Sequence, residues 1–204
     1  MESMTSPLAQ ALCLIAAYLL GSVPFAVVSS KLFGLADPRT YGSGNPGATN
    51  VLRSGNKKAA LVTLIGDAAK GALAVIAARQ FGLSETMVGL VALAVFAGHL
   101  FPIFLKFKGG KGVATAAGVL LAMDPLLGLV VLGTWLFMAF AFRYSSLAAV
   151  TAAAVAPVFN VFMHGGNGQT LVVGILALAL IGKHWGNIQR LLAGQESKIG
   201  SKKK

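Results

Sequence analysis

The sequence predicts an all-α, polytopic membrane protein with about seven transmembrane helices. Of its 204 residues, 56% are hydrophobic and only 11% are charged, and the mean hydropathy is +0.76. A typical soluble domain carries about 25% charged residues, so the composition excludes that class. The apolar residues form about seven separate stretches interrupted by Gly and Ala, and small residues of this kind favour close helix packing in a membrane.

The first three apolar segments are each long enough to cross a bilayer, which takes ~20 helical residues. They cover residues 8–33, 59–80 and 86–105. Within the first, Gly21-Ser22-Val23-Pro24 predicts a kink, because proline cannot donate a backbone hydrogen bond inside a helix. Within the second, Asp67 and Lys70 are three residues apart. They would share one helix face, and we expect a structural ion pair between them.

The remaining four segments cover residues 113–123, 126–142, 145–163 and 170–185. The fourth and seventh of the whole series are shorter than ~20 residues, so we expect local bilayer thinning or the use of flanking residues there. His164 follows the sixth segment in a glycine-rich turn and is expected to be a solvated loop residue. Residues 1–204 are expected to form a single domain, with a basic, disordered tail at about 199–204.

The distribution of basic residues predicts an N-terminus outside and a C-terminus in the cytoplasm. With this orientation, fifteen of the seventeen Lys and Arg residues lie in the inner loops or the tail, in accord with the positive-inside rule. Only Arg79 lies outside, and Lys70 lies within a segment. The simplest explanation of the net charge of +11 is that the basic residues set the topology and contact anionic lipid. Nucleic-acid binding is not expected, because little aromatic sequence is interleaved with the basic residues.

Three polar runs on the expected inner face contain Gly, Ser, Thr and Asn residues that a loop would not need merely to set the topology. They are residues 43–50 (SGNPGATN), residues 106–112 (KFKGGKG) and residues 184–190 (HWGNIQR). Glycine permits positive φ and close approach of the backbone to an anion, and Ser, Thr and Asn supply small hydrogen-bond donors. The alternatives are a tight interhelical turn for the first run and a flexible loop for the second. Together the runs suggest two anionic groups at one bilayer-facing site, with Arg53, Lys108 and Lys111 as phosphate ligands.

Several kinds of chemistry lack their residues in this sequence. Only six acidic residues are present, and no two are close enough in sequence to suggest a carboxylate metal site, so we expect no metal and no cofactor. The chain has no Walker-type P-loop and no G-x-S-x-G nucleophile elbow. No histidine is followed by an aspartate five residues later, so the His-aspartate acyltransferase arrangement is also missing.

Taken in order along the chain, the motifs resemble those of the bacterial integral-membrane glycerol-3-phosphate acyltransferases that use acyl phosphate as donor. The matching stretches span almost the whole length: residues 21–25, 42–53, 66–71, 99–102, 106–115 and 184–198. The resemblance implies transfer of a fatty acyl group from acyl phosphate to the 1-hydroxyl of glycerol 3-phosphate. The products would be 1-acylglycerol 3-phosphate (lysophosphatidic acid) and phosphate, an early step of phospholipid biosynthesis.

Candidate site residues are assigned on this basis. The donor phosphate would be held by Ser43, Gly44, Asn45, Gly47, Ala48, Thr49 and Asn50. Glycerol 3-phosphate would be held by Arg53, Lys108, Lys111, Ser146, His184 and Asn187. Ser43, Asn45 and His184 are the catalytic candidates, because donors in the turn would stabilise charge as the acyl bond breaks. The hydroxyl proton would go to His184 or to a donor phosphate oxygen, and the lack of a nearby carboxylate partner for His184 favours the phosphate.

The resemblance also implies a multi-pass protein of the bacterial inner membrane with its active site on the cytoplasmic side. Its partners would be acyl phosphate, glycerol 3-phosphate and membrane lipids, with no obligate protein partner. The main alternative from another class is a small transporter of a phosphorylated solute. Transport sites normally lie near the membrane midplane within an internal repeat, whereas these motifs cluster on one face. A noncatalytic scaffold would leave the glycine-rich turns unexplained.

Overall fold

The computed structural model describes residues 6–200, and within that range every regular element is helical. The helices are α1 (Pro7–Ser22), α2 (Phe25–Leu32), α3 (Ala48–Leu52), α4 (Lys57–Gln80), α5 (Glu85–Leu100), the 3-10 helix η1 (Ile103–Leu105), α6 (Val113–Met123), α7 (Pro125–Phe142), α8 (Ser145–His164), α9 (Gly168–Lys183) and α10 (Trp185–Leu192). The all-α prediction is therefore confirmed for the described part of the chain.

Four helical stretches are long and apolar enough to cross a membrane alone: Lys57–Gln80, Glu85–Leu105, Pro125–Phe142 and Ser145–His164. Two bent pairs, α1 with α2 and α9 with α10, pass the same test as pairs and raise the count to six. The remaining apolar helix, α6, has only 11 residues, as expected from its short apolar segment. Each of the seven expected segments thus corresponds to one helix or to one bent pair.

The first segment is broken where the sequence predicts a kink. Helix α1 ends at Ser22, α2 begins at Phe25, and the two axes differ by 44°. Pro24 has no N–H to continue the ladder of α1. The first free N–H groups of α2, those of Val27 and Val28, both donate to the carbonyl of Pro24. The break therefore separates two helices that point in different directions.

Small residues bring the long helices into close contact. A Cβ atom on Gly21 of α1 would lie 2.0 Å from the carbonyl oxygen of Val95 in α5. Likewise, a Cβ on Gly118 of α6 would lie 1.9 Å from the carbonyl oxygen of Ala68 in α4. Any side chain at either position would force the helices apart. These glycines explain the close helix packing that the Gly- and Ala-rich sequence predicts.

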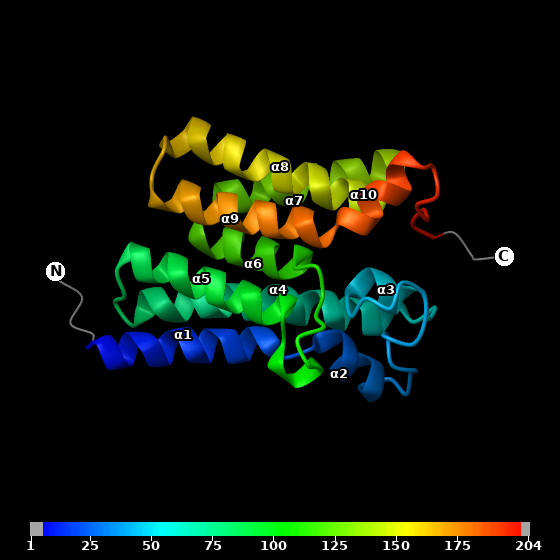
Figure 1. Cartoon of the computed structure of the whole chain (residues 1–204), viewed down its shortest axis with the longest axis horizontal. Helices are drawn as coiled ribbons and strands as arrows, with labels where there is room; N and C mark the ends of the chain where they lie inside the picture. Colours follow the sequence, from blue (N-terminus) through cyan, green and yellow to red (C-terminus); the bar gives the residue numbers. More distant parts are fainter. Residues whose placement is uncertain (1–5, 201–204) are drawn as a thin grey trace.

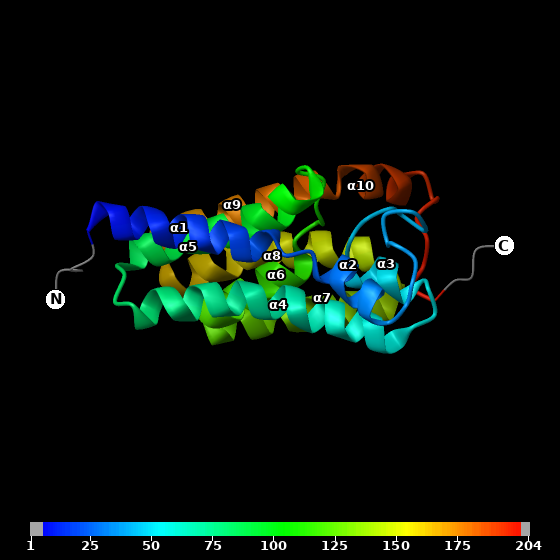
Figure 2. The ribbon, with the colours of Figure 1, turned by 90° about the horizontal axis from the view of Figure 1, so that it is seen from below.

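The helices lie roughly parallel to one long axis (Figures 1 and 2). Helix α1 begins at one end, whereas α2, α3 and α10 lie at the opposite end. Of the expected disordered tail, residues 201–204 lie outside the described residues. The start of that tail is held in place, because the backbone N–H of Ile199 donates to the carbonyl of Arg143 at 2.6 Å.

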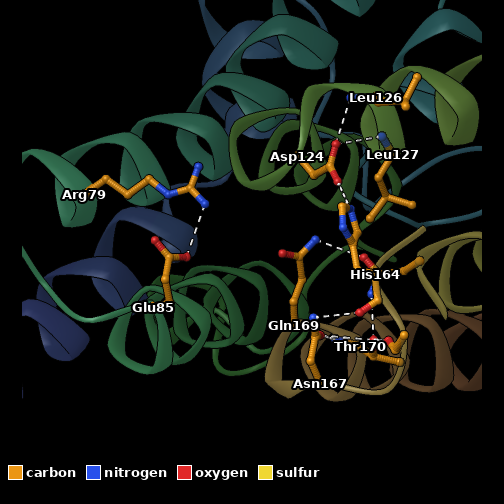
Figure 3. Close-up of polar contacts among 11 residues, drawn as sticks. Arg79, Glu85, Asp124, Leu126, Leu127, His164, Asn167, Gln169 and Thr170 are labelled. Carbon is orange, nitrogen blue, oxygen red and sulfur yellow. Dashed lines mark hydrogen bonds and ion pairs between the residues drawn. The ribbon is translucent and has the colours of Figure 1, made fainter. Parts of the chain in front are cut away.

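An ion pair and a hydrogen-bonded histidine–aspartate pair lie at the end at which α1 begins (Figures 1 and 3). Arg79 and Glu85 pair at 3.3 Å, and Arg79 also donates to the carbonyl of Ala122 at 2.8 Å. His164 pairs with Asp124, whose other carboxylate oxygen accepts the first N–H groups of α7. His164 is exposed, as expected, but it is the last residue of α8 rather than a loop residue, and its hydrogen bond to Asp124 links α8 to the start of α7.

Candidate active site

The polar runs gather toward the other end of the bundle, where α2, α3 and α10 lie (Figure 1). The first run forms the loop into α3, the second is the loop between η1 and α6, and the third begins at the junction of α9 and α10. Lys111 of the second run donates to the Oδ1 atom of Asn187 in the third. Arg53, just after α3, donates to the hydroxyl of Ser197 beyond α10 at 2.7 Å. The runs thus form one connected surface.

The glycine-rich turn has a shape that only glycine allows at key positions. Gly42 and Gly44 have φ of +61° and +68°, in the left-handed region that favours glycine. A Cβ on Gly42 would also lie 2.2 Å from the Oδ1 atom of Asn50. Ser43 and Thr49 are exposed. The turn therefore presents small hydroxyl groups and backbone at the surface, as a phosphate cradle requires.

Asn50 supports this turn from beneath. Its side chain is 2% exposed. Its Oδ1 atom accepts from the N–H of Ser43 at 2.9 Å, and its Nδ2 atom donates to the carbonyls of Pro38 and Tyr41 at 2.6 and 3.2 Å. We expected Asn50 to contact phosphate, but in the structure its amide is engaged in holding the loop. These hydrogen bonds fix the shape of the turn.

The glycines of the second loop pack against the end of α5. A Cβ on Gly109 would lie 2.2 Å from the carbonyl oxygen of His99, and one on Gly110 would lie 2.2 Å from the Nε2 atom of the same residue. The loop is therefore packed in place rather than flexible. Lys108 is exposed and its side chain makes no hydrogen bond or ion pair with the described residues. Lys111 is half-buried and points to α10.

Glu196, which was not predicted as a site residue, lies at the centre of the residues expected to bind glycerol 3-phosphate. It accepts hydrogen bonds from Ser146 Oγ at 2.8 Å, Asn187 Nδ2 at 2.6 Å and Arg190 Nε at 2.8 Å. Burial alone would raise the pKa of Glu196, but these hydrogen bonds and the Arg190 charge outweigh it and lower the pKa. Glu196 is therefore an ionised hub that aligns residues from α8 and α10.

The orientation of the Asn187 amide follows from its two partners. Lys111 can only donate and an ionised carboxylate can only accept, so Oδ1 faces Lys111 and Nδ2 faces Glu196. Burial lowers the pKa of Lys111, while the charge of Glu196 opposes the shift and the charges of Arg190 and Arg53 reinforce it. The site thus holds three cationic groups around one carboxylate, and its excess positive charge suits a phosphate dianion.

His184 lies at the junction where α9 and α10 bend by 59°. Its side chain is 4% exposed, and its Nδ1 atom lies 2.8 Å from the carbonyl oxygen of Leu180. Because a carbonyl only accepts, Nδ1 carries the hydrogen and Nε2 is left as an acceptor. His184 and Asn187 are both buried, as expected for two residues three positions apart on one face.

The structure brings Lys111, Ser146 and Asn187 together, with Arg53 linked to them through Ser197. The turn of residues 43–50, called the donor turn below, is linked to this group because the hydroxyl of Thr49 lies 3.2 Å from the hydroxyl of Ser145, the neighbour of Ser146. Among the residues expected to bind glycerol 3-phosphate, Lys108 and Arg53 are exposed, and of these two Arg53 is held by its hydrogen bond to Ser197. Among the described residues, no group of three His, Cys, Asp or Glu side chains is placed to hold a metal ion.

A family model described as glycerol-3-phosphate acyltransferase matches residues 11–194. The chain belongs to this family. A glycerol-3-phosphate acyltransferase of Dechloromonas aromatica (strain RCB) is 81% identical over 194 residues, which cover 95% of this chain and 98% of the relative. One from Cupriavidus necator is 62% identical over 201 residues, covering 97% of this chain and 100% of the relative.

Two solved structures carry the same fold. A crystal structure of PlsY, an integral membrane glycerol 3-phosphate acyltransferase, in its glycerol 3-phosphate form has a TM-score of 0.88 and 39% sequence identity. It covers 94% of this chain and 96% of that chain. The lysophosphatidic acid form of PlsY has a TM-score of 0.86 and 38% identity, covering 94% of this chain and 95% of the other. This glycerol-3-phosphate acyltransferase is therefore a multi-pass integral membrane enzyme.

Proposed function

We propose that this acyltransferase moves a fatty acyl group from acyl phosphate to the 1-hydroxyl of glycerol 3-phosphate, releasing lysophosphatidic acid and phosphate. One observation carries the proposal: a glycine-rich turn with exposed hydroxyl groups and a cationic cluster lie next to each other, linked through Arg53–Ser197 and Thr49–Ser145. Two anionic substrates can therefore bind next to each other. An acyl phosphate is already activated, so the transfer needs neither ATP nor a covalent enzyme intermediate.

The donor phosphate is assigned to the turn of residues 43–50. Ser43 is exposed and Asn45 half-buried, and both lie where Gly42 and Gly44 turn the backbone. The bond between the acyl carbon and the bridging phosphate oxygen breaks during transfer, and negative charge grows on the departing phosphate. The side chains of Ser43, Asn45 and Thr49 and the backbone N–H of Ala48 would stabilise that charge. The N–H groups of Gly44 and Gly47 donate to Tyr41 and Asn45 within the turn, so these glycines would serve by letting the backbone approach the phosphate. Asn50 would maintain the shape of the turn.

Glycerol 3-phosphate is assigned to the group around Asn187. Arg53 offers a planar fork for the phosphate and Lys111 a point charge. Ser146, His184 and Asn187 supply hydrogen-bonding atoms for the glycerol hydroxyls, and Lys108 is placed at the solvent entrance of the site. Because Ser146 and Asn187 both donate to Glu196, their positions are set before the substrate arrives, which lowers the cost of binding.

The hydroxyl proton is assigned to an oxygen of the donor phosphate. The Nδ1 atom of His184 is held by the Leu180 carbonyl, so its ring is oriented by backbone rather than by a carboxylate that would stabilise an imidazolium ion. In the transfer, the 1-hydroxyl oxygen forms a bond to the acyl carbon as the carbon–phosphate oxygen bond breaks. The proton then leaves with inorganic phosphate, and His184 accepts a hydrogen bond at Nε2 and orients the hydroxyl.

The proposed topology has seven spans, with the N-terminus outside and the C-terminus in the cytoplasm of a bacterium. It is supported by the fifteen basic residues assigned to one side and by the opposite ends at which α1 begins and α10 lies. The active site then faces the cytoplasmic leaflet of the inner membrane, where lipids surround the bundle. Labelling of a cysteine introduced at Ser43 by a membrane-impermeant reagent only from outside intact cells would contradict this orientation.

The deciding experiment measures phosphate release by the purified protein with each substrate alone and with both. We expect release above background only when acyl phosphate and glycerol 3-phosphate are present together, with lysophosphatidic acid formed in equal amount. Acyl coenzyme A is expected not to replace acyl phosphate, and a chelator is expected to leave the rate unchanged. Full activity with the coenzyme A ester would refute the assigned donor. The transporter alternative is set aside because the chain belongs to an acyltransferase family.

A further inference from the structure

A buried cluster of charged groups lies beside the site and has no part in the assignments above. Lys70 and Asp67 of α4 are 2% and 3% exposed and form an ion pair of 2.8 Å. The Nδ1 atom of His99, from α5, lies 3.5 Å from the same carboxylate oxygen of Asp67. Removing two charges from water is costly, and such a pair is rarely justified by stability alone. We therefore ask whether this ion pair holds a neighbouring part of the chain in position.

Lys70 also reaches out of its own helix to the break between α1 and α2. Its Nζ atom donates to the carbonyl of Val23 at 2.8 Å. The N–H groups of Val27 and Val28 both donate to the carbonyl of Pro24 rather than to that of Val23. The hydrogen bond from Lys70 therefore connects the Val23 carbonyl, the last one before the proline, to α4. The ring of Phe25 lies 5.8 Å from the same ammonium group. The direction in which α2 leaves the break is therefore anchored to Lys70.

The anchored helix leads into the donor turn. Residues 33–47 connect α2 to α3, and Ala26 of α2 packs in one core cluster with Val51 of α3. Pro46 of the turn lines a small pocket together with Lys70, His99 and Gly110. The cluster therefore contacts the start of α2 and the second polar loop, and it lines one pocket with Pro46 of the donor turn.

We propose that Lys70, held by Asp67, is a positioning residue for acyl transfer: it fixes the angle of α2 and thereby the place of the donor turn. The inference rests on the proposed assignment of the donor phosphate to residues 43–50. Lys70 does not touch the substrates. Its loss should therefore act on the donor more than on glycerol 3-phosphate, whose assigned residues other than Arg53 lie in the loop before α6, on α8, and at the α9–α10 junction and in α10.

The test is the double variant D67N/K70M. It preserves volume and removes both charges at once, so that no unpaired charge remains buried. We expect the apparent KM for acyl phosphate to rise about tenfold, which corresponds to about 1.4 kcal/mol of lost positioning. The apparent KM for glycerol 3-phosphate is expected to stay within about twofold of the parent, the scatter of a distant substitution. Equal increases in both constants, or no increase for the donor, would overturn the proposal.

A matched control, the pair of Arg79 and Glu85, lies at the C-terminal end of α4 (Figure 3). Arg79 pairs with Glu85 and donates to a backbone carbonyl of another helix, just as Lys70 pairs with Asp67 and donates to Val23. The double variant R79M/E85Q is expected to leave both constants within about twofold of the parent. A donor-selective loss in this control as well would show that the effect is not local to the break, and would contradict the proposal.

A second readout requires no substrate. In a C13S background, a cysteine in place of Ser43 reports the position of the turn through its rate of labelling by a thiol reagent. We expect D67N/K70M to change this rate severalfold and R79M/E85Q to leave it unchanged. An unchanged rate in D67N/K70M would refute positioning even if the true donor were not acyl phosphate. If D67N/K70M does not fold, K70R decides by the same readouts, because its planar head cannot occupy the Val23 contact without shifting α2.

Discussion

Replacement of Lys111 by Met should weaken the binding of glycerol 3-phosphate without slowing the chemical step. Lys111 is half-buried and contacts Asn187, and Met retains most of its stem while removing the charge. A hydrogen bond to a charged group contributes about 1.5 to 3 kcal/mol. With about 1.4 kcal/mol for each factor of ten, the apparent KM should rise about 10- to 150-fold. A charge that holds the phosphate equally in the ground and transition states leaves kcat unchanged.

The assay follows the initial rate of phosphate release at saturating acyl phosphate while glycerol 3-phosphate is varied. Lys106→Met is the matched control, because Lys106 is an exposed lysine of the same loop. Its KM should stay within about twofold of the parent, as for most surface substitutions. A fall in kcat at unchanged KM would show that Lys111 acts in the transition state instead. Identical behaviour of the two variants would refute the placement of Lys111 in the acceptor site.

Three further predictions concern the turn, the histidine and the carboxylate. Ser43→Ala or Asn45→Ala should lower kcat by about 10²- to 10³-fold with little change in either KM, because donors aimed at developing charge act in the transition state; single-turnover rates in detergent check this. His184→Asn should keep the parent's pH–rate profile when saturated, whereas disappearance of the acidic limb with collapse of kcat would make His184 the base. The pKa of Glu196 is lowered from its ordinary value of 4.5. Its contribution to stability is therefore present above about pH 4.5 and is lost as the pH falls through the lower pKa of the folded protein. In thermal unfolding, we expect the parent's stability to fall over this acidic range and that of Glu196→Gln not to show this decline.

Local sequence patterns were sufficient for most of the fold. The kink at Val23-Pro24 and the Asp67–Lys70 pair both follow from residues within four positions of each other, and both are present in the structure. The apolar stretches likewise correspond to the long helices, because a helix that crosses a bilayer needs ~20 predominantly apolar residues. Short-range rules of this kind need no knowledge of which helices are neighbours.

Contacts between distant parts of the chain were not predictable in this way. Glu196 is a single carboxylate in a polar segment, and its partner Ser146 lies 50 residues away. His164 likewise pairs with Asp124 across 40 residues. No spacing within either segment indicates such a pair, so Glu196 was not selected and the partnership of His164 with Asp124 was not expected. The engagement of Asn50 with Pro38 and Tyr41 is also visible only once the loop is folded.

The shortness of α6 has a consequence for how the substrates meet. Only Asp124 separates the end of α6 from the beginning of α7, so these two helix ends lie at one level. At 1.5 Å per residue, the 11 residues of α6 rise about 16 Å and the 18 residues of α7 about 27 Å. Lys111 is thus recessed by about 10 Å relative to the far end of α7. With the proposed assignments, a water-soluble glycerol phosphate would descend to this depth, while a lipid-like donor would stay in its leaflet and the lysolipid would leave sideways into it.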